Sequence, residues 1–159
     1  MSTKILIDAD GCPVVKQTID IAKEKQIEVM VFCDTSHIIN NDYAKIVTVS
    51  KGADSVDFAL VNQVSRGDIV VTQDYGLSAM VVSKGGKPIT QNGIIINDSN
   101  LTMLLTTRHE SKKARMAGAH LKGPKKRTNE NDKAYNEILN KLTKKKRAEI
   151  LSIIVLLLV

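Results

Sequence analysis

Two short apolar segments of the chain each end in aspartate. Residues 5–10 read ILIDAD and residues 69–74 read IVVTQD. Near-continuous apolar runs of this length are typical of strands buried on both faces of a parallel sheet. Ligands bind to such sheets outside the carboxyl ends of the strands. Asp8, Asp10 and Asp74 are therefore expected at one edge, where carboxylates can hold a divalent cation against a phosphate group.

Two further aspartates extend this set, because the segment GADSVD at 52–57 begins a predicted helix after another apolar run. Asp54 and Asp57 are three residues apart and so share one face of that helix. A helix that follows a parallel strand begins at the edge where the strands end. We therefore predict a Mg²⁺ or Mn²⁺ site whose ligands are Asp8, Asp10, Asp54, Asp57 and Asp74, and in which Asp8, Asp10 and Asp74 are catalytic.

Each aspartate also has a purely structural interpretation. Asp54 can cap its helix and complement the helix dipole, and Asp57 can be a solvated residue of the first turn. Asp34 follows an apolar run at 28–33, but it is a weaker candidate and is left out. Asp68 precedes the run that ends near Asp74, so it is expected at the opposite edge of the sheet and serves as a negative control.

The elements that must position these residues alternate between strands and helices. The pattern predicts strands at 4–8, 28–33, 45–49 and 68–72, with helices at 13–25, 54–66 and 75–84 between and after them. Such alternation indicates a parallel sheet with right-handed crossovers. Asn92-Gly93 lies between two β-favouring runs and predicts a short hairpin. Helices are expected at about 98–118 and from about residue 131 onward.

We thus predict an α/β fold with a central, mainly parallel sheet of four strands, a short hairpin and C-terminal helices. A single domain would span 1–143, and 144–159 would form a basic, then apolar, helical tail. The last ten residues, ILSIIVLLLV, are fewer than the about 20 needed to cross a membrane. The favoured interpretation is a helix end buried against the domain or a partner subunit, as in a homodimer. An interfacial membrane anchor with a basic flank is an alternative, and an altered terminus is a third.

The net charge of +6 is unevenly distributed. Residues 1–107 contain 9 Lys and Arg against 12 Asp and Glu, whereas residues 108–159 contain 14 against 5. This asymmetry favours a polyanionic partner, although a solvated basic helix would show the same pattern. The scarcity of aromatic residues argues against stacking of single-stranded bases. The predicted phosphate contacts are a helical stripe and the loop after it, namely Arg108, Lys112, Arg115, Lys122, Lys125, Lys126 and Arg127.

Five further motifs are spread along the chain, namely IDADGCPV, GADSVDFAL, VVTQDYGLSA, LTTRHE with ARMAG, and Gly123-Pro124. Together they resemble the YaiI/YqxD family of uncharacterised bacterial proteins. The resemblance implies a PIN-like fold with an acidic metal pocket formed by the five aspartates named above, and a basic helix that includes Arg108 and Arg115. It brings no established activity, so a nuclease is an analogy at the level of fold.

The sequence thus predicts a metal-dependent nuclease that hydrolyses phosphodiester bonds, with RNA favoured as substrate. A non-catalytic nucleic-acid-binding protein is the main alternative. DADGC also resembles the D-x-D-G-T motif of haloacid-dehalogenase phosphatases, in which Asp8 would be the nucleophile. Cys12 stands where that motif has Thr, so this hypothesis is weaker. The first residues show no secretory signal, and the expected location is the cytoplasm.

Overall fold

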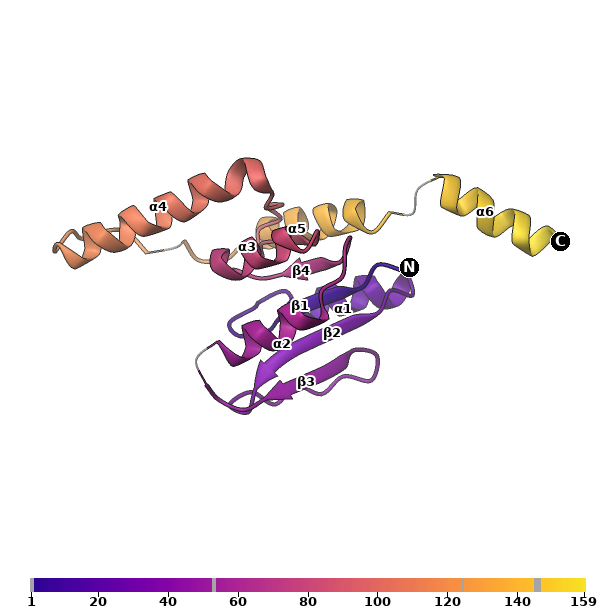
Figure 1. Ribbon diagram of the computed structural model, residues 1–159, viewed down its shortest axis with the longest axis horizontal. Coiled ribbons are helices and arrows are strands. Elements are labelled where there is room, and N and C mark those ends of the chain that lie inside the picture. The colour runs from indigo at the N-terminus through magenta and orange to yellow at the C-terminus, as the bar shows by residue number, and fades with distance from the viewer. Residues whose placement is uncertain (1, 53, 124, 145–146) are drawn as a thin grey trace.

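The computed structural model describes residues 2–52, 54–123, 125–144 and 147–159 of the 159-residue chain. Five strands form one parallel sheet in the order β3-β2-β1-β4-β5 (Figure 1). Their bounds are β1 Ile5–Asp8, β2 Val29–Asp34, β3 Lys45–Val49, β4 Ile69–Val71 and β5 Lys87–Ile89. The predicted α/β fold with a central parallel sheet is confirmed.

Helices cover both faces of the sheet. α1 (Val15–Glu24) and α5 (Asn129–Leu142) pack on one face, and α2 (Ser55–Gln63) and α3 (Tyr75–Ser83) pack on the other (Figure 1). Alternate strand residues point to opposite faces, so Ile5 and Ile7 contact the α1 and α5 layer while Leu6 contacts the α2 and α3 layer. The result is a three-layer structure with a buried core on each side of the sheet.

The order of the strands reverses between β1 and β4. From β1 the chain builds outward through β2 and β3, and it then returns to place β4 on the other side of β1. The helices that follow these two neighbouring strands leave in different directions, because α1 packs on one face and α3 on the other. This is the position at which open α/β sheets bind their ligands.

The predicted hairpin is corrected by the structure. Residues 87–89 form β5, a fifth parallel strand that α3 connects to β4, and the hairpin is limited to one antiparallel bridge beyond it. The chain does turn at Asn92-Gly93, where Gly93 has a φ of 82° and donates its N–H to Thr90 O at 3.0 Å. The return segment forms only an isolated antiparallel bridge between Ile89 and Ile95. The Asn-Gly pair specifies only the turn, whereas the fully buried Ile89 is fixed by its pairing with Val71 of β4.

Two helices extend from this three-layer body. α4 (Asp98–Met116) contains no buried residue and projects away from the sheet, and α6 (Arg147–Leu158) follows α5 at the other end of the molecule (Figure 1). Within the ranges given above, no helix is both long and apolar enough to cross a membrane.

Candidate metal centre

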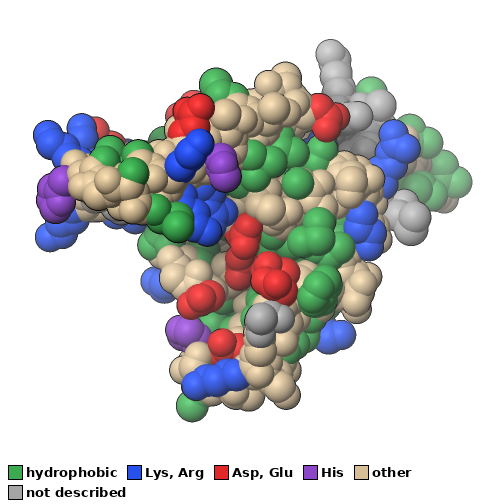
Figure 2. Space-filling view, turned by 60° about the vertical axis from the view of Figure 1, so that its left-hand side comes forward, with side chains coloured by type: hydrophobic (Ala, Val, Ile, Leu, Met, Phe, Trp, Pro, Cys, Tyr) green, Lys and Arg blue, Asp and Glu red, His purple; other side chains and the backbone are tan. Residues whose placement is uncertain are grey.

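The five predicted carboxylates lie at the carboxyl edge of the sheet, and acidic side chains gather in the middle of one face of the molecule (Figure 2). Asp8 ends β1 and Asp10 follows it, Asp74 immediately precedes α3, and Asp54 and Asp57 lie at the start of α2. Burial is the largest cause that raises the pKa of Asp8 and Asp57, and negative charges nearby add to it. Asp74 and Asp10 act on Asp8 in this way, and Asp74, Asp8 and Asp54 act on Asp57. The structure therefore brings all five into one electrostatic cluster.

Asp8 is the most constrained member of this cluster. Burial is the main cause that raises the pKa of its carboxyl, and the charges of Asp74 and Asp10 add to that effect. A hydrogen bond from Thr72 acts in the opposite direction, because it stabilises the ionised carboxylate. The Thr72 hydroxyl donates this bond to Asp8 Oδ2 at 2.8 Å.

Thr72 is a site residue that the sequence analysis missed. It is almost fully buried directly after β4, and its Oγ1 also accepts the backbone N–H of Asp74 at 3.1 Å. One hydroxyl thus connects two candidate ligands that are 66 positions apart in the chain. The sequence did contain a sign of this role, because Thr72 is a polar residue at the end of an otherwise apolar run, two positions before Asp74.

Asp74 has a structural role as well as a candidate functional one. Its Oδ1 accepts the backbone N–H groups of Gly76 at 2.8 Å and Leu77 at 3.1 Å, which caps the N-terminus of α3. The same oxygen lies 3.8 Å from a guanidinium nitrogen of Arg108, on α4. Oδ2 makes none of these contacts, so the capped orientation leaves one oxygen available to a ligand.

Asp57 and Asp54 complete the cluster from α2. Burial, followed by the charges of Asp74, Asp8 and Asp54, raises the pKa of Asp57 to about 6. Asp54 occupies the N-cap position of α2 with a left-handed φ of 61°, a conformation that Asp tolerates better than most residues. Its side chain makes no capping hydrogen bond. Helix capping therefore does not account for the Asp54 carboxylate.

The Asp10 side chain is 76% exposed and lies near His37 and Asp34, the aspartate that was left out of the predicted site. Its Oδ1 lies 3.7 Å from Nε2 of His37, whose Nδ1 lies 3.5 Å from Asp34 Oδ1. Hydrogen bonds from Ser36 lower the pKa of Asp34. Asp34 is thus at the same edge as Asp10, and the signal for it was its position after β2, equivalent to that of Asp8 after β1.

Asp68 lies at the opposite edge, as expected. Its carboxylate is buried at the start of β4, where Oδ2 pairs with Lys4 Nζ at 2.5 Å and accepts the Ser65 N–H at 2.8 Å. The position of Asp68 confirms that strand direction separates structural from candidate functional aspartates in this chain.

The donor set fits a hard divalent cation, because every candidate ligand supplies carboxylate oxygen. Across the described ranges, no three His, Cys, Asp or Glu side chains already form a group that could hold a metal ion. Burial raises the pKa of Asp8 and Asp57, and the charges of neighbouring aspartates raise both further; a cation would offset that repulsion. Binding would require side-chain movements that bring Asp8, Asp57 and Asp74 onto one ion.

Basic side chains lie beside the acidic cluster (Figure 2). On α4, Arg108, Lys112 and Arg115 are exposed at i, i+4 and i+7. In the following loop Lys122, Lys125 and Lys126 are also exposed. These six side chains are placed so that phosphate groups could reach them.

Arg127 differs from the other predicted phosphate contacts. Its guanidinium donates to Asp132 Oδ1 at 2.8 Å, to Asn92 Oδ1 at 3.1 Å and to Gln91 O at 2.9 Å. Three acceptors therefore occupy it, and they join the start of α5 to the turn after β5. This arrangement gives Arg127 a structural role in holding the two segments together.

The sequence of this chain is similar to a known protein family over most of its length. The family model "Uncharacterized BCR, YaiI/YqxD family" matches residues 6–145, so the resemblance read from the motifs is confirmed. A UPF0178 protein of Clostridium acetobutylicum is 47% identical over 141 residues, which cover 87% of this chain and 95% of the relative. UPF0178 proteins of Exiguobacterium sibiricum (46% identical; 90% and 98% covered) and Lachnoclostridium phytofermentans (49%; 89% and 97%) are similar. The family match includes every candidate site residue and ends before α6.

Proposed function

Because the chain belongs to the YaiI/YqxD family of uncharacterised proteins, whose name states no reaction, we propose a function from the site itself: metal-dependent hydrolysis of phosphodiester bonds in nucleic acid, with RNA as the favoured substrate. The observation that carries the proposal is the convergence of Asp8, Asp57 and Asp74 beside Arg108. An acidic cluster binds a cation, and a cation next to arginine binds phosphate.

In this proposal Asp8, Asp57 and Asp74 hold Mg²⁺ or Mn²⁺, and Asp10 and Asp54 complete the shell directly or through water. Such an ion lowers the pKa of water and polarises the phosphoryl oxygen. The protein's contribution is orientation. Thr72 holds the Asp8 carboxylate, and the backbone N–H groups at the start of α3 hold Asp74. Both orientations exist before any ligand arrives.

The basic side chains would bind the substrate backbone. Arg108 is 61% exposed and is paired with Asp74 only at 3.8 Å, so its guanidinium can turn from that carboxylate to a phosphate. Lys112 and Arg115 continue the same stripe along α4. Binding of this kind is largely independent of sequence and weakens steeply as salt rises. A cytoplasmic RNA would meet these requirements.

A second candidate function is nucleic-acid binding without catalysis. It is favoured by the two roles already held by Asp74 Oδ1, which caps α3 and lies near Arg108. A carboxylate used in this way can serve as a fixed structural element in a protein that has lost its metal. Both hypotheses predict salt-sensitive binding, and only the first predicts cleavage.

The distinguishing experiment incubates the purified full chain and end-labelled RNA or DNA with Mn²⁺, Mg²⁺ or EDTA. We expect metal-dependent cleavage that Asp8→Asn and Asp74→Asn each reduce by about 100-fold or more. Asp20→Asn, an exposed change on α1, is the matched control and should cleave normally. Salt-sensitive binding with no cleavage under any metal condition would support the non-catalytic function. Turnover of a phosphomonoester with an acyl-phosphate trapped at Asp8 would support the phosphatase hypothesis.

A further inference from the structure

α6 has an apolar surface around its whole circumference. Leu156, Leu157 and Leu158 are 77%, 81% and 82% exposed, and Ile153, Ile154 and Val155 are each more than two fifths exposed. Successive helical residues are rotated by about 100°, so six consecutive exposed side chains cover every direction around the axis. A helix that is apolar on all sides requires an environment that can surround it.

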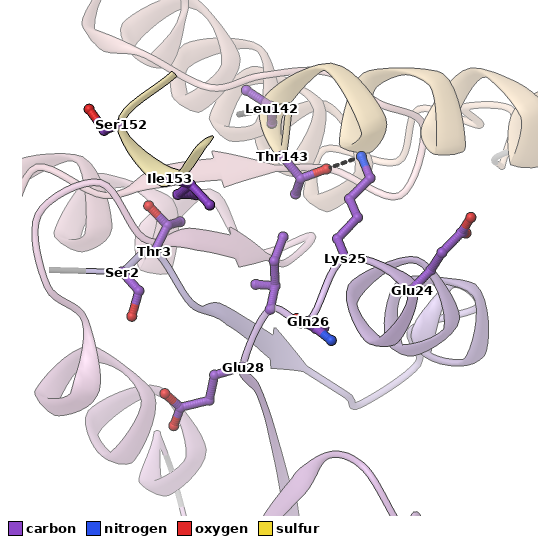
Figure 3. A pocket seen from close by; sticks show the side chains of 11 residues that line it. Ser2, Thr3, Glu24, Lys25, Gln26, Glu28, Leu142, Thr143, Ser152 and Ile153 are labelled. Atoms are coloured by element: carbon purple, nitrogen blue, oxygen red, sulfur yellow. Dashed lines mark hydrogen bonds between the residues drawn. The ribbon is translucent and has the colours of Figure 1, made fainter. Parts of the chain in front are cut away.

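Within the described ranges, the side chains at the end of α6 stay exposed. α6 extends from the end of the molecule, and two of its residues, Ser152 and Ile153, lie beside the domain (Figures 1 and 3). They line a cavity of about 970 Å³ together with charged side chains that include Glu24, Lys25 and Glu28. Ile27 and Leu142 also border this cavity, but Leu156, Leu157 and Leu158 are not among its lining residues and stay exposed. The apolar end of α6 is therefore left to an external partner.

The residues before α6 indicate the charge of that partner. Lys144, Lys145, Lys146 and Arg147 form an unbroken basic run in the sequence, of which residues 145 and 146 lie outside the described ranges. Ala148 and Glu149 follow this run in the sequence, and the apolar segment begins at Ile150. A net positive segment followed by an apolar one matches the profile of an anionic lipid surface, with headgroups outside and hydrocarbon beneath. α6 also lies beyond residues 6–145, which match the family.

We propose that α6 is a membrane anchor: its apolar end enters an anionic lipid bilayer, and the basic run binds the lipid headgroups. The all-round apolar surface favours lipid over a second copy of the chain, because a helix partner covers a single stripe whereas acyl chains surround the helix.

The anchor would also orient the domain. Ser2, Thr3 and Glu28, which border the cavity next to α6, precede β1 and β2, so α6 emerges near the amino edge of the sheet. The acidic cluster lies at the opposite, carboxyl edge. A membrane-bound molecule would therefore present its acidic cluster away from the lipid.

The test measures co-sedimentation of the full chain with vesicles of phosphatidylcholine alone or mixed with phosphatidylglycerol. We expect binding to the mixed vesicles that is at least about tenfold tighter than to the neutral ones and that weakens with salt. Leu157→Glu should weaken binding about tenfold or more. Met116→Glu is the matched control, because Met116 on α4 is also 81% exposed and should bind as the unaltered protein does.

A second variant keeps the proposal testable if Leu157→Glu aggregates. Lys144→Gln combined with Arg147→Gln leaves the apolar residues intact and should reduce binding to the mixed vesicles alone. Failure of the folded protein to bind mixed vesicles would overturn the proposal. So would a stable dimer in light scattering that Leu157→Glu dissociates while vesicle binding is absent, because α6 would then be an interface between two copies.

Discussion

The Thr72 hydroxyl donates a hydrogen bond of 2.8 Å to the Asp8 carboxylate, across the junction between β4 and β1. The oxygen of that hydroxyl accepts the backbone N–H of Asp74 at 3.1 Å. The relative positions of two candidate metal ligands therefore depend on one buried side chain that carries no charge itself. Its removal should disturb the site without changing the number of carboxylates.

Replacing Thr72 by Val should test that dependence, because Val has nearly the same shape but no hydroxyl. We expect the pKa of Asp8 to rise further, since the Thr72 hydrogen bond is what lowers it. The free energy of unfolding should fall by about 1–2 kcal/mol because a partly buried carboxylate loses a donor. Urea unfolding and NMR titration of Asp8 would measure the two effects.

Thr72→Ser provides the matched control, because it keeps the hydroxyl and removes only a methyl group. The pKa of Asp8 should return to its value in the unaltered protein. If Ser and Val gave the same Asp8 titration, the hydrogen bond would not be what orients this carboxylate.

The raised pKa of Asp57 makes stability depend on pH. Its carboxyl ionises at about 6 in the folded protein, against an ordinary value of 3.8. Between these two values the folded state holds a proton that the unfolded state has lost, so the stability contributed by this group falls as pH rises through that window. Asp8 acts in the same direction. Above about pH 6 the full destabilisation from Asp57 is present.

Asp57→Asn should remove this pH dependence in the absence of divalent cations. Because the Asp57 side chain is partly exposed to solvent, screening reduces the expected gain at neutral pH to about 1 kcal/mol relative to the unaltered protein. Urea unfolding in EDTA at pH values on both sides of the window would measure it. An Asn variant whose stability varies with pH as steeply as that of the unaltered protein would contradict the assignment to Asp57.

Divalent cations should stabilise the protein by relieving the repulsion among the aspartates. At a free Mn²⁺ concentration tenfold above the dissociation constant, the gain is about 1.4 kcal/mol, which corresponds to a rise in Tm of roughly 3–6 °C for a chain of this size. Thermal unfolding monitored by circular dichroism would measure it. The combined Asp8→Asn and Asp74→Asn variant should show no rise, and an equal rise in both proteins would locate the ion elsewhere.

Arg108 and Arg127 should respond differently to substitution. Arg108→Ala should weaken oligonucleotide binding and reduce the slope of log affinity against log salt by about 1, with stability changed by no more than about 0.5 kcal/mol. Arg127→Ala should instead cost about 1–3 kcal/mol of stability, since three acceptors lose their donor. Fluorescence anisotropy and urea unfolding would separate the two effects. A salt slope reduced by Arg127→Ala in the folded protein would show that Arg127 also contacts phosphate.

The common edge of the aspartates was predictable because it follows from strand direction alone. All parallel strands end at one edge, so Asp8 and Asp74 had to lie together once β1 and β4 were assigned. The opposite position of Asp68 follows from the same rule and was also predicted correctly. Periodicity and strand polarity, which are local properties, were enough for these conclusions.

What could not be predicted depends on contacts between distant segments. The Thr72 hydrogen bond requires the side-by-side pairing of β1 and β4, and the three acceptors of Arg127 include residues 35 and 36 positions away. Asn92-Gly93 is a local signal for a hairpin, but the pairing of residues 87–89 parallel to β4 depends on the crossover through α3. Local sequence patterns specify which residues form a helix or strand, but they do not specify which other helix or strand it packs against.

The reversal of strand order between β1 and β4 has an evolutionary consequence. The meeting point of their ends is produced by chain connectivity, with α1 and α3 packed on opposite faces, and it does not depend on carboxylates. Residues at positions 8, 57 and 74 can therefore be exchanged while the buried strands retain their packing. Such a scaffold allows the chemistry at this point to diverge between descendants that keep the same fold, because selection on stability acts mainly on Ile5, Leu6, Ile7 and their neighbours.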